Sequence, residues 1–353
     1  MNLESLDDIL KLISPGTQMR EGLNRIVEQG NGGLLVIGNQ DQVEKIISSG
    51  FSMNAKLTPQ TLSELSKMDG ALVIEEDLST ITYSNAHLSP DPSIQSEETG
   101  TRHKAAEQTS KQLNLPTIAI SGRRNRITVY FKSKSYILRD IEDILSKVNQ
   151  ALLILDQYRD DFTESRRELT AMEISGRVLP FHVAQVLRYI SQMIHMEKEI
   201  NRMFVELGEE KDLPERQLEN LMVGVESDFN FIIEDYKTDQ ENNIEEIKAQ
   251  IMDISSENLL STEKVMNPLG YDEGDLDRFL NPRGFRLLES IPRLPTTVIN
   301  RMVKRFENLE NVLHADKEEL QEVKGIAQAR ANNIEAGLRR LENRVVLREE
   351  LGE

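Results

Sequence analysis

The sequence contains no cysteine and only five histidines among its 353 residues. The absence of cysteine excludes disulfides, thiolate nucleophiles, zinc ribbons and iron–sulfur clusters, and it fits a reducing cytosol. The histidines are scattered and lack metal-ligand spacing: His87, His103, His182, His195 and His314. We therefore expect no structural zinc site.

Long apolar runs are also missing. The longest uninterrupted ones are short, such as Ala151–Leu155, far below the roughly 20 residues that span a bilayer. The N-terminal segment "MNLESLDDILKLI" is acidic and amphipathic, without the basic n-region and cleavage site of a signal peptide. With 38% hydrophobic and 29% charged residues, the composition is typical of a soluble globular protein of two or three domains, with no membrane partner.

Positive charge is scarce, and the formal net charge of −18 is unevenly distributed. Residues 151–280 carry 13 basic and 29 acidic side chains, whereas residues 281–353 carry 13 basic and 12 acidic ones. The middle of the chain is therefore not expected to contact nucleic acid. The C-terminal part is the segment where contact with phosphate is electrostatically tolerable.

The first 139 residues alternate helix and strand signals, which predicts several helices packed against a mixed sheet. Asp41 is expected to cap a helix over "QVEKIISSG", and Thr58 with Pro59 to open another. Further helices are predicted at residues 3–13, 17–29 and 101–114. Strands are predicted at "LLVIG", "FSMNAKL", "ALVIEED", "TITYSNAHL", "TIAIS", "RITVYF" and "SYILR".

The pattern changes near residue 140, where apolar positions begin to recur at helical spacing with almost no strand signal. The turn-forming "NPRG" at residues 281–284 indicates a boundary. Two related segments follow, "LESIPRLPTTVINRMVKRF" and "LQEVKGIAQARANNIEAGL", each typical of helix, short hairpin, helix. We predict a multidomain chain, α/β and then all-α, with domains at residues 1–140, 141–284 and 285–353.

Within the first domain, "SEETGTRHKAAEQTSKQL" places a glycine and basic side chains at the start of a predicted helix. The free N–H groups of a helix N-terminus form an anion site, and Gly100 would let a ligand approach the backbone. Basic residues in a first turn oppose the helix dipole, so Arg102 and Lys104 favour a phosphate ligand. The alternative is an ordinary N-cap followed by a solvated basic turn.

Two other turns of this domain carry polar groups. Asp69-Gly70-Ala71 precedes a predicted strand; it is either a simple turn or a carboxylate that holds a divalent metal or a sugar hydroxyl. "SGRRNR" at residues 121–126 is either a charged hairpin or a second phosphate contact. Together, one carboxylate, one helix start and one arginine turn are the parts of a nucleotidyl transfer site.

The motifs "DGA", "AHLSPDPSI", "SEETGTRHKAAE" and "AISGRRN" resemble, in this order and spacing, the diadenylate cyclase domain. The whole layout is similar to the family of DNA integrity scanning proteins, which have a cyclase domain, a helical linker domain and a C-terminal helix-hairpin-helix domain. The resemblance implies that two ATP molecules condense to cyclic di-AMP and two pyrophosphates, with Mg²⁺ or Mn²⁺. It also implies facing sites in an octamer, in the bacterial cytoplasm and associated with the nucleoid.

The family's motifs assign roles to residues of this sequence. Asp69 would hold the metal and help to activate the 3′-hydroxyl, and His103 would join it in catalysis. The ATP-binding residues would be Gly70, Leu88, Thr101, Arg102, His103, Lys104, Ala105, Ser121 and Arg124. The family usually has Arg-His-Arg where this sequence has Arg102-His103-Lys104, and lysine keeps the charge but loses bidentate geometry.

The resemblance also implies that branched DNA binds the C-terminal domain and modulates the cyclase in a DNA damage response. Hairpin N–H groups would bind DNA phosphates without reading sequence. The residues implied are Arg293, Arg301, Lys304, Lys324, Gly325, Ala327 and Arg330. Ala327 replaces the second glycine of the usual motif, which requires a backbone without positive φ there.

Two other functions stay open at this point. One is a non-enzymatic scaffold that binds ATP and DNA junctions without turnover. The other is a structural helical adaptor whose last domain binds protein; it predicts no affinity for nucleotide.

Overall fold

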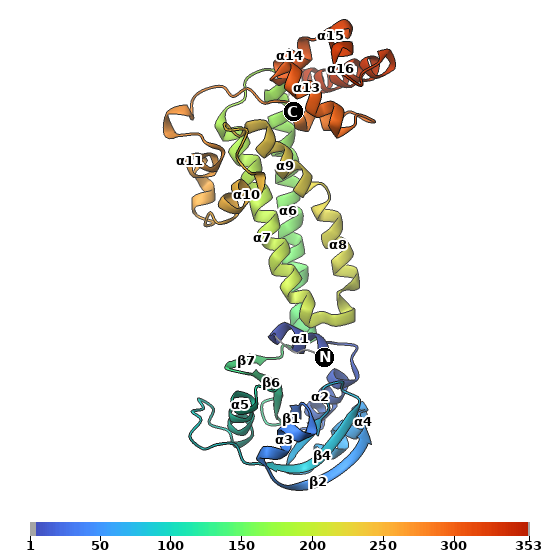
Figure 1. Ribbon diagram of the computed structural model, residues 1–353, viewed down its shortest axis with the longest axis vertical. Helices are drawn as coiled ribbons and strands as arrows, with labels where there is room; N and C mark the ends of the chain where they lie inside the picture. Colours follow the sequence, from blue (N-terminus) through green and yellow to red (C-terminus); the bar gives the residue numbers. More distant parts are fainter. Residues whose placement is uncertain (1–4, 352–353) are drawn as a thin grey trace. The chain divides into compact units, whose positions relative to one another are not determined.

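The computed structural model describes residues 5–351 and divides the chain into two compact units. The first comprises the residues up to Gln150 together with Ile200–Glu215, and the second comprises Ala151–Glu199 together with the residues from Arg216 onward. Figure 1 shows the α/β and the helical parts in the colours of the sequence. Each unit is described by itself below.

The first unit is built on a seven-stranded sheet of order β2-β4-β3-β1-β5-β6-β7. The strands are β1 (Gly33–Ile37), β2 (Ile47–Lys56), β3 (Ala71–Ile74), β4 (Thr80–Leu88), β5 (Thr117–Ser121), β6 (Arg126–Phe131) and β7 (Lys134–Ile137). Among the strands that the structure describes, only β1 and β3 pair in parallel. The mixed sheet expected from the sequence is confirmed.

Both faces of the central strands are covered by helices, which is why "GLLVI" and "ALVI" are apolar throughout. The helices of this unit are α1 (Leu6–Leu12), α2 (Gln18–Glu28), α3 (Gln40–Val43), α4 (Pro59–Leu65) and α5 (Thr101–Leu113). Leu35 and Leu72 pack in one core with α1, α2 and α4. Leu34 and Ala71 point to the opposite face, into a second core with α3 and α5.

Most helices and strands of the first unit lie where the sequence predicts them, and one predicted helix is wrong. Thr58 caps α4 with its side chain, and Pro59 is the first helical residue, as predicted. The helix expected over "QVEKIISSG" is wrong, because Asn39 caps a short α3 and residues 47–56 form β2. This segment pairs with β4 along the edge of the sheet, and this long-range pairing overrides its local helical pattern.

The second unit is helical. The helices that lie wholly within it include α9 (Val225–Tyr236), α10 (Ile244–Met252), α11 (Thr262–Met266), α12 (Phe285–Glu289), α13 (Thr296–Phe306), α14 (Leu309–His314), α15 (Lys317–Glu322) and α16 (Gln328–Leu351). The two long helices α6 (Ile141–Ile174) and α7 (Pro180–Leu207) contribute residues to both units, and so does α8 (Asp212–Met222). No helix among the described residues is long and apolar enough to cross a membrane.

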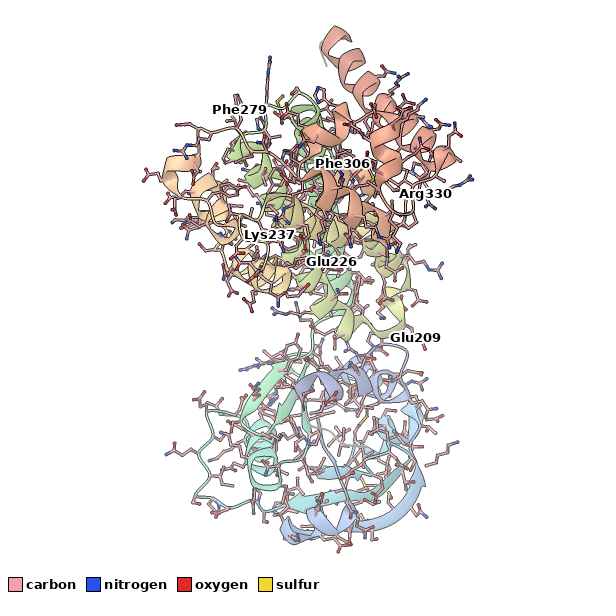
Figure 2. The ribbon with its side chains drawn as sticks, turned by 45° about the horizontal axis from the view of Figure 1, so that its top comes forward. Glu209, Glu226, Lys237, Phe279, Phe306 and Arg330 are labelled. Atoms are coloured by element: carbon pink, nitrogen blue, oxygen red, sulfur yellow. The ribbon has the colours of Figure 1, made fainter. Side chains whose placement is uncertain are left out.

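The predicted internal repeat is present as two helix–turn–helix pairs, α12–α13 and α15–α16, which share one hydrophobic core. Figure 2 labels Phe306 at the end of α13 and Arg330 near the start of α16. Arg293 and Gly325 hold the same place in the two turns, with φ of 64° and 102°. The pairs brace each other reciprocally. Arg301 donates to the Lys324 carbonyl at 2.7 Å, and Asn333, at the equivalent position of α16, donates to the carbonyl of Pro292 at 2.8 Å.

A buried polar cluster joins α12 to the longer helices of the same unit. Asp235 accepts hydrogen bonds from the backbone N–H groups of Gly284, Phe285 and Arg286, at 2.7, 2.6 and 3.0 Å. The Arg286 guanidinium donates to the Glu173 carboxylate. The α9 residue Asp235 therefore caps α12 from a distant part of the chain, which fixes the first of the two helix–turn–helix pairs onto α6 and α9.

Candidate active site

A cavity of about 640 Å³ opens at one edge of the sheet in the first unit. This edge holds the N-terminal ends of the parallel strands β1 and β3 and the C-terminal ends of their antiparallel neighbours β4 and β5. Its volume lies in the range of small-molecule sites. The lining residues are Leu34, Asp69, Gly70, Ala71, Ala86, His87, Leu88, Gly100, Thr101, Arg102, His103, Ala105, Ile120, Ser121, Gly122 and Arg123.

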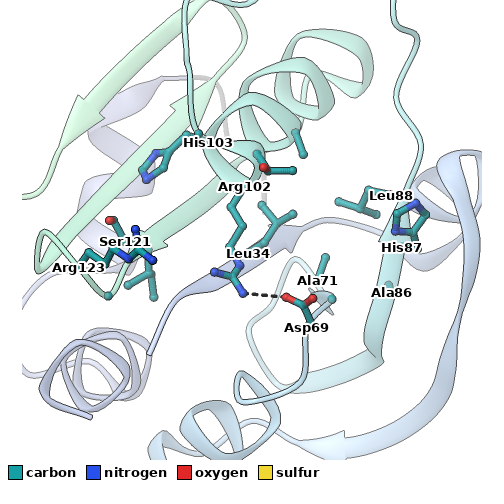
Figure 3. Close-up of a pocket in the computed structure, with 16 residues that line it drawn as sticks. Leu34, Asp69, Ala71, Ala86, His87, Leu88, Arg102, His103, Ser121 and Arg123 are labelled. Carbon is teal, nitrogen blue, oxygen red and sulfur yellow. Dashed lines mark hydrogen bonds and ion pairs between the residues drawn. The ribbon is translucent and has the colours of Figure 1, made fainter. Parts of the chain in front are cut away.

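Both polar and apolar side chains line the cavity (Figure 3). Leu34, Ala71, Ala86 and Leu88 supply apolar surface from three adjacent strands. The side chains of the α5 start and the turn after β5 supply polar surface, together with Asp69 and His87. The arrangement suits a ligand with a flat apolar part and a charged part.

Asp69 lies two residues before β3, and packing requires a glycine at the next position, Gly70. A Cβ on Gly70 would lie 2.3 Å from the Asn85 carbonyl carbon and 2.7 Å from the Ala86 nitrogen. Strand β4 crosses at this point, so no other residue fits without moving its backbone. The family's motifs place Gly70 among the ATP-binding residues, and the structure gives a further reason for glycine there, which is the close approach of β4.

The N-terminus of α5 has no side-chain cap. Gly100 is the N-cap residue, and Thr101 is the first helical residue, so Thr101 does not cap the helix. A Cβ on Gly100 would meet only ordinary contacts with His103, the nearest at 3.7 Å. Neighbouring protein atoms therefore do not require glycine here, whereas a ligand approaching the free first-turn N–H groups would benefit from it.

Arg102 links the two ends of the candidate site. Its guanidinium donates to the Asp69 carboxylate with an Nη2–Oδ1 distance of 2.9 Å (Figure 3). The Asp69 side chain is 96% exposed, so the pair is accessible to a ligand. Gly32 makes room for this arginine, because a Cβ there would lie 2.5 Å from Arg102 Nη1.

His103 lies on the same side of the cavity as Ser121 and Arg123 in Figure 3. Its Nδ1 is 2.9 Å from the Tyr130 hydroxyl on β6. Burial lowers the pKa of His103, nearby Glu98 raises it, and Arg126 and Arg124 lower it further. The net effect lowers the pKa, which favours a neutral imidazole.

Seven of the nine predicted ATP-binding residues line the cavity; the other two, Lys104 and Arg124, are exposed and do not. Lys104 is in the first turn of α5, and its N–H donates to the Gly100 carbonyl at 2.8 Å. In the turn after β5, Arg123 lines the cavity where the sequence suggested Arg124.

Sequence reasoning missed several residues of the site: Gly32, Leu34, Ala86, His87, Ile120, Gly122 and Arg123. Most are strand residues that reach the cavity only because the starts of β1 and β3 meet the ends of β4 and β5 there. The glycine-rich segment "GNGG" at residues 30–33 is the sequence signal that marks this part of the site.

A divalent metal would have to be shared with a ligand. No group of three or more histidine, aspartate or glutamate side chains among residues 5–351 could hold a metal ion. Mg²⁺ is commonly bound by one or two carboxylates together with substrate phosphates. The single exposed carboxylate of Asp69 fits that mode.

In the C-terminal pairs, the predicted phosphate contacts are exposed except Arg330, which is partly buried: Arg293, Arg301, Lys304, Lys324, Gly325, Ala327 and Arg330. Two of the arginines also brace the second turn, because Arg301 donates to the Lys324 carbonyl and Arg330 to that of Gly325. Ala327 is not among the described residues with positive φ, so alanine is compatible with its place in the turn.

The α/β unit matches a family model described as DisA bacterial checkpoint controller nucleotide-binding, over residues 20–135. By this match, the α/β unit is a nucleotide-binding domain of this class. A second model, DisA bacterial checkpoint controller linker region, matches residues 138–276. The chain is 42% identical over 335 residues to the DNA integrity scanning protein DisA of Carboxydothermus hydrogenoformans, covering 94% of this chain and 95% of the relative. It is 40% identical over 347 residues to that of Acetivibrio thermocellus, covering 98% and 96%. The chain belongs to the DNA integrity scanning protein DisA family.

Proposed function

We propose that the protein is a diadenylate cyclase, which condenses two ATP molecules into cyclic di-AMP and two pyrophosphates. The observation that carries the proposal is the cavity itself. It contains one exposed carboxylate, Asp69, and a basic helix start without a side-chain cap, and Arg102 of that helix start contacts Asp69 with an Nη2–Oδ1 distance of 2.9 Å. These groups suit the ribose and the phosphates of one ATP, and the family match supports a nucleotide as the ligand.

Each reactive step makes one P–O bond and breaks another. The 3′-hydroxyl of one ATP attacks the α-phosphorus of a second, pyrophosphate leaves, and the reciprocal attack closes the ring. One cavity holds one ATP, so the reaction needs two cavities that face each other. We propose that an oligomer, an octamer by the family resemblance, supplies the facing pair.

The chain's own residues would position the triphosphate. The free N–H groups of the first turn of α5, beginning at Thr101, would donate to phosphate oxygens. Arg102 would exchange its Asp69 partner for phosphate, which releases the carboxylate at the moment ATP binds. Ser121 and Arg123 would hold the other side of the triphosphate, while Leu88 and Leu34 pack against the adenosine.

Asp69 would hold Mg²⁺ or Mn²⁺ together with ATP, and the ion would offset negative charge on the phosphates and lower the pKa of the attacking hydroxyl. Asp69 would also orient the 3′-hydroxyl of the ATP in its own cavity.

The test is product formation by the purified full-length protein with ATP and Mg²⁺ or Mn²⁺, measured by chromatography. Asp69→Asn should lower the rate at least about 100-fold, as expected for loss of a charge that acts on the reacting groups. Asp41→Asn is the matched control, because Asp41 is exposed and follows the opposite end of β1. Absence of product from the wild type, with ATP binding and assembly intact, would leave an ATP-binding DNA scaffold as the function.

We further propose that the two C-terminal pairs form a helix-hairpin-helix domain that binds branched DNA and modulates the cyclase. The proposal is supported by exposed basic side chains at the turns and by turn geometry repeated in both pairs. The linkage of α12 to α9 through Asp235 gives DNA binding a rigid attachment to the linker helices. Binding of a four-way junction should weaken steeply with salt.

A further inference from the structure

A hydrogen-bonded chain runs behind the histidine of the candidate site. His103 Nδ1 is 2.9 Å from the hydroxyl of Tyr130, and that hydroxyl donates to the Glu98 carboxylate at 2.7 Å. The rings of His103 and Tyr130 meet edge to face, with an interplanar angle of 70°. Tyr130 is buried, with 1% of its surface exposed, and it does not line the cavity.

The protons in this chain can be placed by counting donors. A tyrosine hydroxyl has one proton, and a carboxylate only accepts. Because the Tyr130 proton goes to Glu98, the hydroxyl oxygen must accept from His103, so Nδ1 carries a proton. The neutral imidazole then has a bare Nε2 as its second nitrogen.

Glu98 is held in place by the helix that carries His103. Its segment is tied to α5 by Ser96, which donates to Glu107 at 2.5 Å, and by Gln108, which donates to the Ile94 carbonyl at 2.8 Å. Lys111 adds a contact of 3.0 Å to the Gln95 carbonyl. The acceptor for Tyr130 is therefore fixed relative to the imidazole before any ligand binds.

We propose that Tyr130 and Glu98 are positioning residues, which hold the neutral His103 in the tautomer protonated at Nδ1. As a result, His103 takes up a second proton, at Nε2, when ATP binds. A bare Nε2 would repel a phosphate oxygen lone pair, whereas a protonated Nε2 donates to it with charge assistance. The proposal rests on the proposed function, because it assumes that the phosphates of ATP reach His103.

The charged groups around the imidazole favour this coupling. Glu98 faces it from the preceding loop, Arg126 from the start of β6 and Arg124 from the turn between β5 and β6. In the free protein burial and the two arginines lower the pKa of His103, so the ring is neutral near pH 7.5. A bound triphosphate adds negative charge, which raises that pKa and draws a proton onto Nε2.

The experiment is isothermal titration of the full-length protein with 3′-deoxyadenosine triphosphate and excess Mg²⁺, in two buffers of different ionisation enthalpy. This probe lacks the attacking hydroxyl, so no turnover occurs. The wild type should take up a proton fraction approaching one near pH 7.5, and its affinity should fall up to about tenfold per pH unit above neutrality. His103→Gln should abolish this uptake. Any proton exchange that remains in this variant comes from the nucleotide itself and can be subtracted from the wild-type value.

Tyr130→Phe removes the hydroxyl with little change of shape. We expect an affinity about five- to tenfold weaker and a smaller proton uptake, with Glu98→Gln nearer the wild type because its amide oxygen still accepts. Equal proton uptake by the wild type and His103→Gln would overturn the inference. So would a Tyr130→Phe variant that loses thermal stability but keeps the wild-type uptake, since that result indicates a structural role only.

The outcomes separate the inference from the cyclase. Proton-coupled binding without cyclic di-AMP from ATP supports the inference and refutes the cyclase. Binding with product but no coupled proton refutes the inference alone. Failure of the wild type to bind the probe at all overturns both.

Discussion

Replacing Asp235 by alanine should locally unfold the junction between α9 and α12. The side chain is 3% exposed and accepts three backbone N–H groups at 2.6–3.0 Å. Each buried donor left without a partner costs about 1–3 kcal/mol, which sums to about 3–9 kcal/mol. Partial entry of water reduces this, so we expect about 3–5 kcal/mol, similar to breaking a buried charged contact.

The assay is hydrogen–deuterium exchange of the full-length protein, followed by mass spectrometry. Peptides that contain residues 284–290 should exchange at least about 100-fold faster in Asp235→Ala, since about 1.4 kcal/mol corresponds to a factor of ten. Peptides of the β-sheet should be unchanged. Asp253→Asn is the control, because Asp253 is exposed at the end of α10. Unchanged protection of residues 284–290 would refute the view that Asp235 is the cap of α12.

Three further outcomes follow from the cavity and the C-terminal turns. Gly70→Ala should destabilise the first unit by about 1–3 kcal/mol, because its Cβ would meet β4 backbone at 2.3 Å; a melting temperature equal to that of the wild type would contradict this. Gly32→Ala should displace Arg102 and weaken ATP binding about tenfold in calorimetry, since a charge-assisted contact contributes about 1.5–3 kcal/mol; unaltered affinity would show that this guanidinium does not reach the phosphates. Lys324→Ala should lower the slope of junction binding against salt by about one, measured by fluorescence anisotropy, whereas Lys317→Ala, a lysine paired with an acidic side chain of α16, should not; equal slopes would place DNA elsewhere.

The sequence located most elements of the first unit and the motifs of its site. Apolar runs such as "TIAIS", the Thr58 cap and the basic start of α5 are local signals, and each is found where it was expected. The error at residues 47–50 has a physical cause. This segment has apolar residues at helical spacing, but it forms part of the edge strand β2 because it pairs with β4, almost 40 residues further along the chain.

The motifs of the site are short segments of sequence, but the contacts that form the site join segments far apart in the chain. The motifs named Asp69, Arg102 and His103 separately, but not the ion pair between the first two or the tyrosine behind the third. Those contacts depend on where β3, α5 and β6 lie after the sheet has formed. The turn after β5 gives a second example. The motif named Arg124, but the backbone path of the turn places Arg123 at the cavity instead.

The sequence by itself determined the order of helices and strands, the cysteine-free chemistry and the charge contrast between the middle and the end of the chain. These follow from side-chain type, spacing and turn preference, which act over a few residues. Only the tertiary structure decided that Gly70 must be glycine because β4 passes it, that Tyr130 and Glu98 stand behind His103, and that Asp235 caps a helix some 50 residues further along the chain. Such contacts join groups far apart in sequence, and burial of both partners in one core fixes them.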